Sequence, residues 1–225
     1  MGELIIRRRE MILPDNTPIL PAGYQRVEYI ERPTSAGTGY GWTDTYFMPS
    51  DSDVTVIKFG CVPLKKPNSG RAYIVAGAKN TSGNDVGFGV FWTTDFNFIG
   101  CYGGEDCTVQ PNSGSSILNT QLDVVATRTP TYASIVCNGV SNRVDYTPRT
   151  MSKSFDVFLM RGSGSSGYYY CAWARVSYLQ IENNGVPVVN LVPARRISDN
   201  KKGFYDTISG VFDPSGTYVA GPDVT

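Results

Sequence analysis

Short runs of alternating apolar and polar residues recur along almost the whole chain, and this pattern most constrains its fold. Residues 54–59 and 122–128 alternate in this way and are rich in β-branched side chains, as half-buried strands are. No apolar stripe of helical period extends beyond two turns. Two Asn-Gly pairs, at 138–139 and 184–185, mark tight hairpins because both turn positions need a positive φ. The pattern predicts an all-β, two-sheet antiparallel sandwich with less than about a fifth helix.

The same reasoning divides most of the chain into strands and loops. Residues 155–160 are apolar on both faces and are expected to be central, and residues 168–182 are long enough for one bent strand or two. Stretches rich in Ser, Gly and Asn at 79–84, 103–116 and 162–167 are expected to be loops. The remaining expected strands are 71–77, 86–92, 96–102, 132–137, 186–192, 203–206, 210–213 and 218–221.

Composition and charge exclude several classes of function. The 225 residues contain no histidine, which removes Ser-His-Asp and Cys-His nucleophiles and HExxH zinc sites. Lys plus Arg and Asp plus Glu number 20 each, so nothing indicates a basic surface for nucleic acid or an anionic membrane. No apolar run of about 18 residues predicts a transmembrane helix. We therefore expect neither a nucleic-acid nor a membrane partner.

The five cysteines show no CxxC spacing, which argues against a zinc ribbon or a thioredoxin-like motif. Buried free thiols, packing as small apolar side chains, are the expected state. A disulfide between Cys101 and Cys107 is the alternative, and it would need an oxidising compartment.

Residues 1–19 differ from the rest and predict an extended arm. Leu4, Ile5 and Ile6 form a short β-like run, and Arg7, Arg8 and Arg9 follow it. Prolines at 14, 18 and 21 prevent a helix and keep the segment extended. The apolar run at 11–13 is too short for a signal peptide, so we expect export by a route other than general secretion. We expect residues 4–9 to dock on a partner. The apolar residues 4–6 would add a strand to the partner's sheet, and the arginines 7–9 would pair with its acidic groups.

Two sequence blocks resemble a known family. The block LPAGYQRVEYIE at 20–31 resembles the opening of a laminin-G-like, concanavalin A-like jelly-roll family found in phages, prophages and surface proteins of gut bacteria. The block at 176–196, with Asn184-Gly185 and VPARR, and the glycine-bounded segments to residue 222 resemble that family's C-terminal segment. The resemblance implies one jelly-roll domain over 20–225 behind the arm of 1–19. Residues 32–47 are longer than the family's equivalent segment.

The resemblance leaves three functional hypotheses. The first is a non-enzymatic phage virion or surface-appendage protein with an outward jelly-roll domain, docked through its arm and able to bind host glycans. The second is a carbohydrate-binding module of a gut bacterium. The third, a glycoside hydrolase, is disfavoured because two facing carboxylates are needed, and no same-face carboxylate pair is found outside a turn. We therefore expect no enzymatic activity, and a virion or extracellular location.

Ligand contacts are expected from aromatic side chains, because a sugar ring presents an apolar C–H face. The candidates are Tyr40, Trp42, Trp92, Tyr102 and Tyr169, with burial in the core as the alternative for each. No cofactor and no metal site are expected. A calcium site is an alternative only if the loops that carry Asp51, Asp53 and Glu105-Asp106 meet in the fold. The choice of glycan, the partner of the arm and a homo-oligomeric state stay open.

Overall fold

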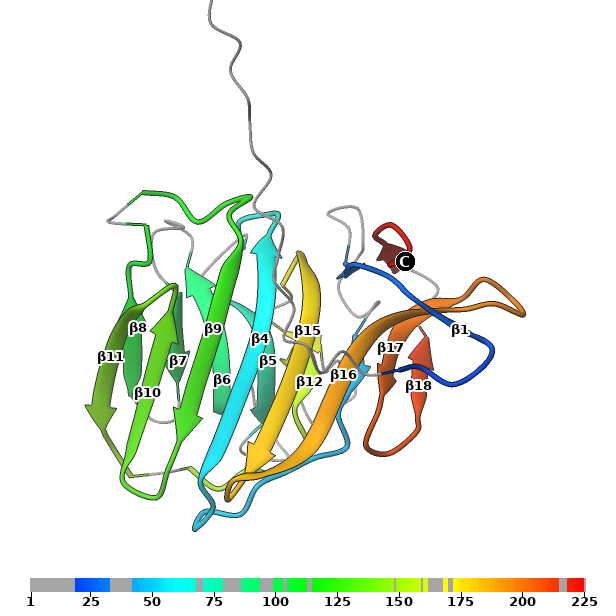
Figure 1. Cartoon of the computed structure of the whole chain (residues 1–225). Coiled ribbons are helices and arrows are strands. Elements are labelled where there is room, and N and C mark those ends of the chain that lie inside the picture. Colours follow the sequence, from blue (N-terminus) through cyan, green and yellow to red (C-terminus); the bar gives the residue numbers. More distant parts are fainter. Residues whose placement is uncertain are drawn as a thin grey trace, which may run out of the picture.

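The computed structural model describes residues 19–32, 42–67, 71–78, 86–93, 99–102, 105–112, 115–147, 149–158, 160–161, 168–169, 172–214 and 218–224. Every regular element in these ranges is a β-strand (Figure 1). The strands are β1 (Tyr24–Arg26), β2 (Ile30–Glu31), β3 (Thr43–Asp44), β4 (Thr55–Pro63), β5 (Arg71–Ala78), β6 (Val86–Thr93), β7 (Ile99–Tyr102), β8 (Asp106–Val109), β9 (Leu122–Arg128), β10 (Tyr132–Cys137), β11 (Val140–Asp145), β12 (Asp156–Val157), β13 (Met160–Arg161), β14 (Tyr168–Tyr169), β15 (Ala174–Asn183), β16 (Val186–Arg196), β17 (Lys202–Asp206), β18 (Phe212–Pro214) and β19 (Val219–Ala220).

The strands form two large sheets, one behind the other in Figure 1. The larger sheet follows the order β11-β10-β9-β4-β15-β16-β17-β18, with β1 paired to β16 and β2 paired to both β15 and β19. The smaller sheet has six strands in the order β3-β12-β5-β6-β7-β8, and β13 pairs with β14 separately. The pairing of both large sheets is antiparallel, so the prediction of a two-sheet sandwich is confirmed.

The core lies between the inner faces of the two sheets. Strand β4 alternates as its sequence predicts, and it contributes Ile57 and Phe59 to the core. Strand β6 contributes Phe88, Val90 and Trp92 from the other sheet, all fully buried in the same apolar cluster. Because its indole is fully buried in this cluster, Trp92 is part of the core. Truncation of such a side chain to alanine lowers the free energy of unfolding by about 3–5 kcal/mol.

Both Asn-Gly pairs form the predicted hairpins. Asn138 and Gly139 have φ values of 48° and 84° and join β10 to β11, while Asn184 and Gly185 have φ values of 50° and 78° and join β15 to β16. Asparagine and glycine tolerate this left-handed conformation best, which is why the pair fixes the turn type. The two turns set the register of β10 with β11 and of β15 with β16, the two longest strands of the larger sheet.

Two segments differ from the sequence-based expectation, and a third resolves a stated alternative. The loop expected over 103–116 contains strand β8, which extends the smaller sheet and is held by its pairing with β7. The strand expected over 155–160 is interrupted after Val157, because Phe158 has a φ of 71°, which a strand cannot contain. The run at 168–182 forms two strands, β14 and β15, which is one of its two expected arrangements.

Four cysteines are buried free thiols, as expected: Cys61, Cys101, Cys107 and Cys137. Cys101 and Cys107 are directly opposite each other on β7 and β8. The disulfide considered as the alternative would therefore join two cross-strand neighbours. Burial raises the pKa of Cys61 well above its ordinary range, which keeps that thiol protonated. The thiols therefore act as small apolar side chains in this structure.

Several expectations lie outside the described residues. These are the docking arm with Leu4, Ile5, Ile6, Arg7, Arg8 and Arg9, the ligand candidate Tyr40, the fifth cysteine, Cys171, and the loops at 79–84 and 162–167. Pairing among the described strands begins at Tyr24. In the described ranges, none of the structure is a helix that could cross a membrane.

Candidate functional site

A second, smaller cluster of buried aromatic side chains lies on the smaller sheet, separate from the main core. Its members include Tyr73 from β5 and Phe91 from β6, with Tyr102 from β7 packed against them. Tyr73 and Phe91 are direct cross-strand partners, and Tyr102 is the partner of Gly89, two residues from Phe91. Residues two apart on a strand share a face, so the three rings lie together on the outer face of the sheet. We call this group, with the charged residues described next, the outer-face cluster.

Two glycines make room for the rings. A Cβ on Gly89 would lie 2.8 Å from Cδ1 of Tyr73, and a Cβ on Gly100 would lie 3.1 Å from Cζ of Phe91. Each glycine thus leaves a gap in the pleated surface into which the neighbouring ring folds. The rings of Tyr73 and Phe91 have centroids 5.5 Å apart at an angle of 56°, a tilted aromatic pair. The rings therefore lie low over the sheet.

The side chain of Arg71 lies over the rings of Phe91 and Tyr102. Its guanidinium carbon is 4.4 Å from the ring centroid of Phe91 and 5.1 Å from that of Tyr102. The same guanidinium pairs with the carboxylate of Asp106 on β8 and donates a hydrogen bond of 3.4 Å to the hydroxyl of Tyr73. Burial raises the pKa of Tyr73 to about 12, opposed by the hydrogen bond from Arg71, so the hydroxyl stays protonated at neutral pH.

A second arginine reaches the same ring from a different segment. The guanidinium carbon of Arg149 lies 5.2 Å from the ring centroid of Tyr102. Both guanidinium groups are thus within the range of a cation–π interaction with one ring. Tyr102, Arg71 and Arg149 are all partly exposed, whereas Tyr73 and Phe91 beneath them are buried. The exposed part of the cluster is therefore one partly buried aromatic ring with two guanidinium groups over it.

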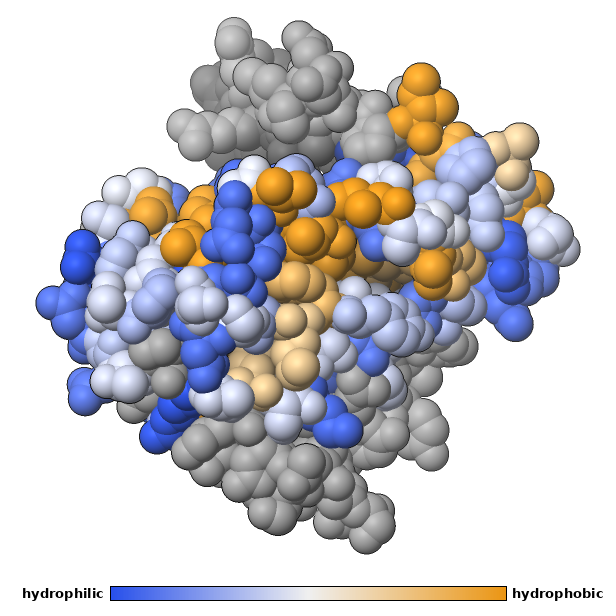
Figure 2. All heavy atoms as spheres, turned by 90° about the horizontal axis from the view of Figure 1, so that it is seen from below, coloured by the Kyte–Doolittle hydropathy of each residue, from blue (hydrophilic) through white to orange (hydrophobic). Residues whose placement is uncertain are grey.

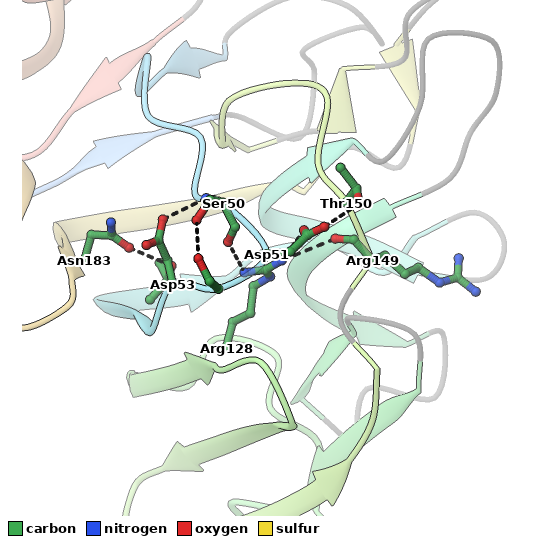
Figure 3. A network of polar contacts seen from close by, with 9 residues as sticks. Ser50, Asp51, Asp53, Arg128, Arg149, Thr150 and Asn183 are labelled. Atoms are coloured by element: carbon green, nitrogen blue, oxygen red, sulfur yellow. Dashed lines mark hydrogen bonds and ion pairs between the residues drawn. The ribbon is translucent and has the colours of Figure 1, made fainter.

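A buried ionic network fixes the backbone that carries Arg149. Arg128, at the end of β9, is fully buried and donates hydrogen bonds to the carbonyl of Ser50 (2.8 Å), to Asp51 (3.1 Å) and to the carbonyl of Arg149 (3.4 Å). Thr150 donates a hydrogen bond of 2.5 Å to the other oxygen of Asp51. Figure 3 shows these contacts, with the side chain of Arg149 pointing away from the network. The main chain that carries Arg149 is thus held at the carbonyl of Arg149 and, one residue on, through the side chain of Thr150.

Three of the four carboxylates considered for calcium are engaged elsewhere. Asp51 binds Arg128 and Thr150, and Asp106 pairs with Arg71. Asp53 closes the turn before β4: it accepts from the main-chain N–H of Ser50 and from Asn184, and this hydrogen bond with Asn184 lowers its pKa to about 2. In the part of the chain that the structure describes, no group of three Cys, Asp or Glu side chains could hold a metal ion.

The structure separates the five predicted ligand residues. Of the candidates whose side chains the structure describes, Tyr102 is the one in the outer-face cluster. Trp92 is wrong as a ligand contact, because its side chain points into the core and has no exposed surface. Trp42 is half-buried beside β3, at the opposite edge of the smaller sheet from β8. Tyr169 has only its backbone described, in β14, and Tyr40 lies outside the described ranges.

Sequence reasoning missed the charged half of the cluster. A search for aromatic residues alone passes over Arg71, Asp106 and Arg149, which come from two strands and a loop far apart in sequence. One local signal was available: Arg71 and Tyr73 are two apart in a strand, so they must share a face. No sequence signal links Arg149 to this face, because its position depends on the long-range network of Arg128.

A second surface lies at one end of the sandwich. Figure 2 shows apolar side chains gathering in a band on this end. Exposed large apolar residues of the loop before β4 and of the turns next to β16 and β18 are Tyr46, Met48, Val54, Val186, Ile208 and Val211. The pocket beside β3 and the β17–β18 turn has a volume of only about 10 Å³, room for one water molecule. It is too small for a saccharide.

Comparison with known proteins identifies the fold. No protein-family model matches the sequence, and no curated protein sequence matches it. Among solved structures, a heptameric SAP-like pentraxin from Limulus polyphemus matches with a TM-score of 0.52 and 12% identity, over 69% of this chain and 76% of that chain. The fold is a concanavalin A-like jelly roll.

Other solved structures match with lower TM-scores. Domains LG4-5 of the mouse laminin alpha1 chain match with a TM-score of 0.47 and 14% identity, over 72% of this chain but only 44% of that chain. The alginate lyase AlgAT5 from polysaccharide lyase family 7 matches with a TM-score of 0.40 and 13% identity, over 59% of this chain and 60% of that chain. At such identities the likeness concerns the fold alone, and function must be argued from the site.

Proposed function

We propose that this protein is a non-enzymatic saccharide-binding module that holds its ligand on the outer face of the six-stranded sheet. The observation that carries the proposal is the partly exposed ring of Tyr102 with the guanidinium groups of Arg71 and Arg149 within 5.2 Å of its centroid. An aromatic ring offers a surface for the C–H face of a sugar, and guanidinium groups offer planar sets of donors for its oxygens. The rings of Tyr73 and Phe91 below keep this surface rigid, which lowers the entropic cost of binding.

Binding without catalysis fits the charges in the cluster. A glycosidase needs two carboxyl groups about 5–9.5 Å apart across the scissile bond. Among the described residues, Asp106 is the carboxylate that contacts the cluster, and it is held by Arg71. Incubation with common polysaccharides should release no reducing ends. Release that disappears in Asp106→Asn would instead establish a hydrolase.

A glycan array probed with the full chain tests the proposal directly. We expect a restricted set of saccharides to bind, and Tyr102→Ala to reduce that binding about tenfold or more. Stacking of a nucleic-acid base on one aromatic ring contributes about 1–3 kcal/mol, and a tenfold change corresponds to about 1.4 kcal/mol. The matched control is Tyr132→Ala. Tyr132 also lies under an arginine, with Arg143 3.9 Å from its ring centroid, but on the larger sheet. Equal loss in both variants, or no binding by the wild type, would contradict the proposal.

We further propose that the module is displayed on a phage virion or comparable surface appendage. Support comes from the sequence resemblance and from the arm of residues 1–19, which precedes the first paired strand, β1. Deleting residues 1–18 should leave the melting temperature nearly unchanged and abolish assembly with the partner. An unfolded truncation would place the arm in the core, and normal assembly would make it a simple tail. Genes for capsid and tail proteins beside this one would separate a virion protein from a binding module of a gut bacterium.

A further inference from the structure

Arginine residues stacked on aromatic rings occur at several places in the described part of the chain, and Arg149 differs from them. Four of the other five in the described ranges also pair with a carboxylate: Arg71 with Asp106, Arg143 with Asp145, Arg175 with Glu31 and Arg196 with Asp199. The fifth, Arg32, is fully buried over Trp173 and donates a hydrogen bond to the carbonyl of Ala172. None of the described carboxylates pairs with Arg149, whose guanidinium contacts the ring of Tyr102. This guanidinium therefore retains its donors for a group outside the protein.

The charge of the exposed part of the outer-face cluster is unbalanced. Arg71 and Arg149 contribute two positive charges beside Tyr102, and Asp106 contributes one negative charge that Arg71 already neutralises. The unmatched cation is Arg149. It stands on a main chain anchored through its own carbonyl by the buried Arg128 and, one residue on, by Thr150. A fixed, unmatched guanidinium beside a sugar-stacking ring suits an anionic group.

We propose that the saccharide held on this face is acidic, carrying a carboxylate or sulfate that forms a charge-assisted pair with Arg149 while its ring packs on Tyr102. This inference rests on the proposed saccharide-binding function and names the class of its ligand. A carboxylate and a sulfate each present two acceptor oxygens on one central atom, and a guanidinium fork can bind such a pair with two hydrogen bonds. A neutral sugar offers hydroxyl groups only, and it would leave the charge of Arg149 unmatched.

The test uses matched pairs of saccharides and the full chain. Each acidic oligosaccharide, a hexauronate and a sulfated hexasaccharide, is paired with its carboxyl-reduced or desulfated counterpart, and dissociation constants are measured by calorimetry. We expect the acidic member of at least one pair to bind about tenfold or more tightly, which corresponds to about 1.4 kcal/mol. The preference should weaken as salt concentration rises. The uronate and sulfate arms distinguish the two sources of the anion.

Two variants locate the effect. Arg149→Gln keeps the carbonyl that Arg128 binds, so we expect unchanged folding and loss of the acidic preference. Arg143→Gln, which removes a stacked arginine from the larger sheet, should keep the preference. Equal binding of acidic and neutral members would overturn this inference and leave saccharide binding standing. Binding of neither member, with no hits on the glycan array, would overturn the proposed function together with it.

Discussion

On strand β6, Phe91 and Trp92 are neighbours in sequence and both are fully buried, yet they lie on opposite faces of the smaller sheet. Trp92 belongs to the main core between the sheets. Phe91 lies under Arg71 on the outer face, in a cluster that ends in the exposed part of Tyr102. The inner face is closed by packing against a second sheet, whereas the outer face is closed in part by charged side chains. Aromatic content alone therefore does not tell a binding face from a core face.

The largest expected difference between the two faces is in stability. Trp92→Ala should reduce the free energy of unfolding by about 3–5 kcal/mol, because it leaves a cavity in the core. Tyr102→Ala, on the outer face, should cost about 1 kcal/mol or less, since its ring is already partly exposed. Urea unfolding of the two variants measures both values. Similar losses would show that the outer-face cluster is a second core and not a surface.

The network that joins the larger sheet to the site should show the next largest effect. Arg128→Met should lower the free energy of unfolding by about 2–4 kcal/mol, because it leaves the carbonyls of Ser50 and Arg149 without their donor. Binding should weaken as well, since Arg149 loses its anchor. Arg143→Met at an exposed position serves as the control and should change stability by about 0.5 kcal/mol or less. If Arg128→Met kept the stability and the binding of the wild type, the network would be needed for neither.

The third prediction concerns Gly89, over which the ring of Tyr73 packs closely on the outer face. Gly89→Ala would place a Cβ 2.8 Å from Tyr73 and 2.8 Å from Cβ of Ala76, so we expect a loss of about 1–3 kcal/mol from overpacking. The ring of Tyr73 must also move, and binding should weaken. Thr108→Ala on the same face adds no atoms and should have little effect on either. Thermal unfolding measures the stability of both variants. If Gly89→Ala were as stable as the wild type, the close contact between residue 89 and the ring of Tyr73 would not hold the rings in place.

The smallest expected effect concerns the turn before β4. Asp53 has a pKa of about 2, below its ordinary 3.8, chiefly because Asn184 donates a hydrogen bond to it. A lowered carboxylate pKa stabilises the fold above the ordinary value, and the stabilisation is lost as pH falls through the folded value. Asp53→Asn should therefore show a smaller drop in melting temperature between pH 4 and pH 2 than the wild type. An identical pH profile would show that this turn contributes no acid dependence.

The fold was largely readable from the sequence because its signals are local. Alternation at 54–59 and the two Asn-Gly turns depend on neighbouring residues, and the structure places β4 and both hairpins where these signals predict them. Strand β8 was missed because pairing with β7 outweighs its polar, glycine-flanked sequence. The interruption at Phe158 was also missed, since its left-handed φ is imposed by the fold and not by its type.

The candidate site was only partly readable, for a physical reason. Tyr102 was selected as an aromatic residue near a glycine loop, but nothing local distinguishes it from Trp92. The two arginines that define the site meet over its ring from strand β5 and from the loop after β11. Such a meeting depends on which strands pair and on the buried side chain of Arg128, both of which are long-range properties.

The central claim is that ligand binds over Tyr102 and not at another aromatic residue. The most direct test is the dissociation constant of a saccharide selected on the array, measured for the wild type, Tyr102→Ala and Trp42→Ala. Trp42 lies at the opposite edge of the same sheet. The account predicts about tenfold or greater weakening in Tyr102→Ala and an unchanged value in Trp42→Ala. Weakening in Trp42→Ala with an unchanged Tyr102→Ala would contradict it.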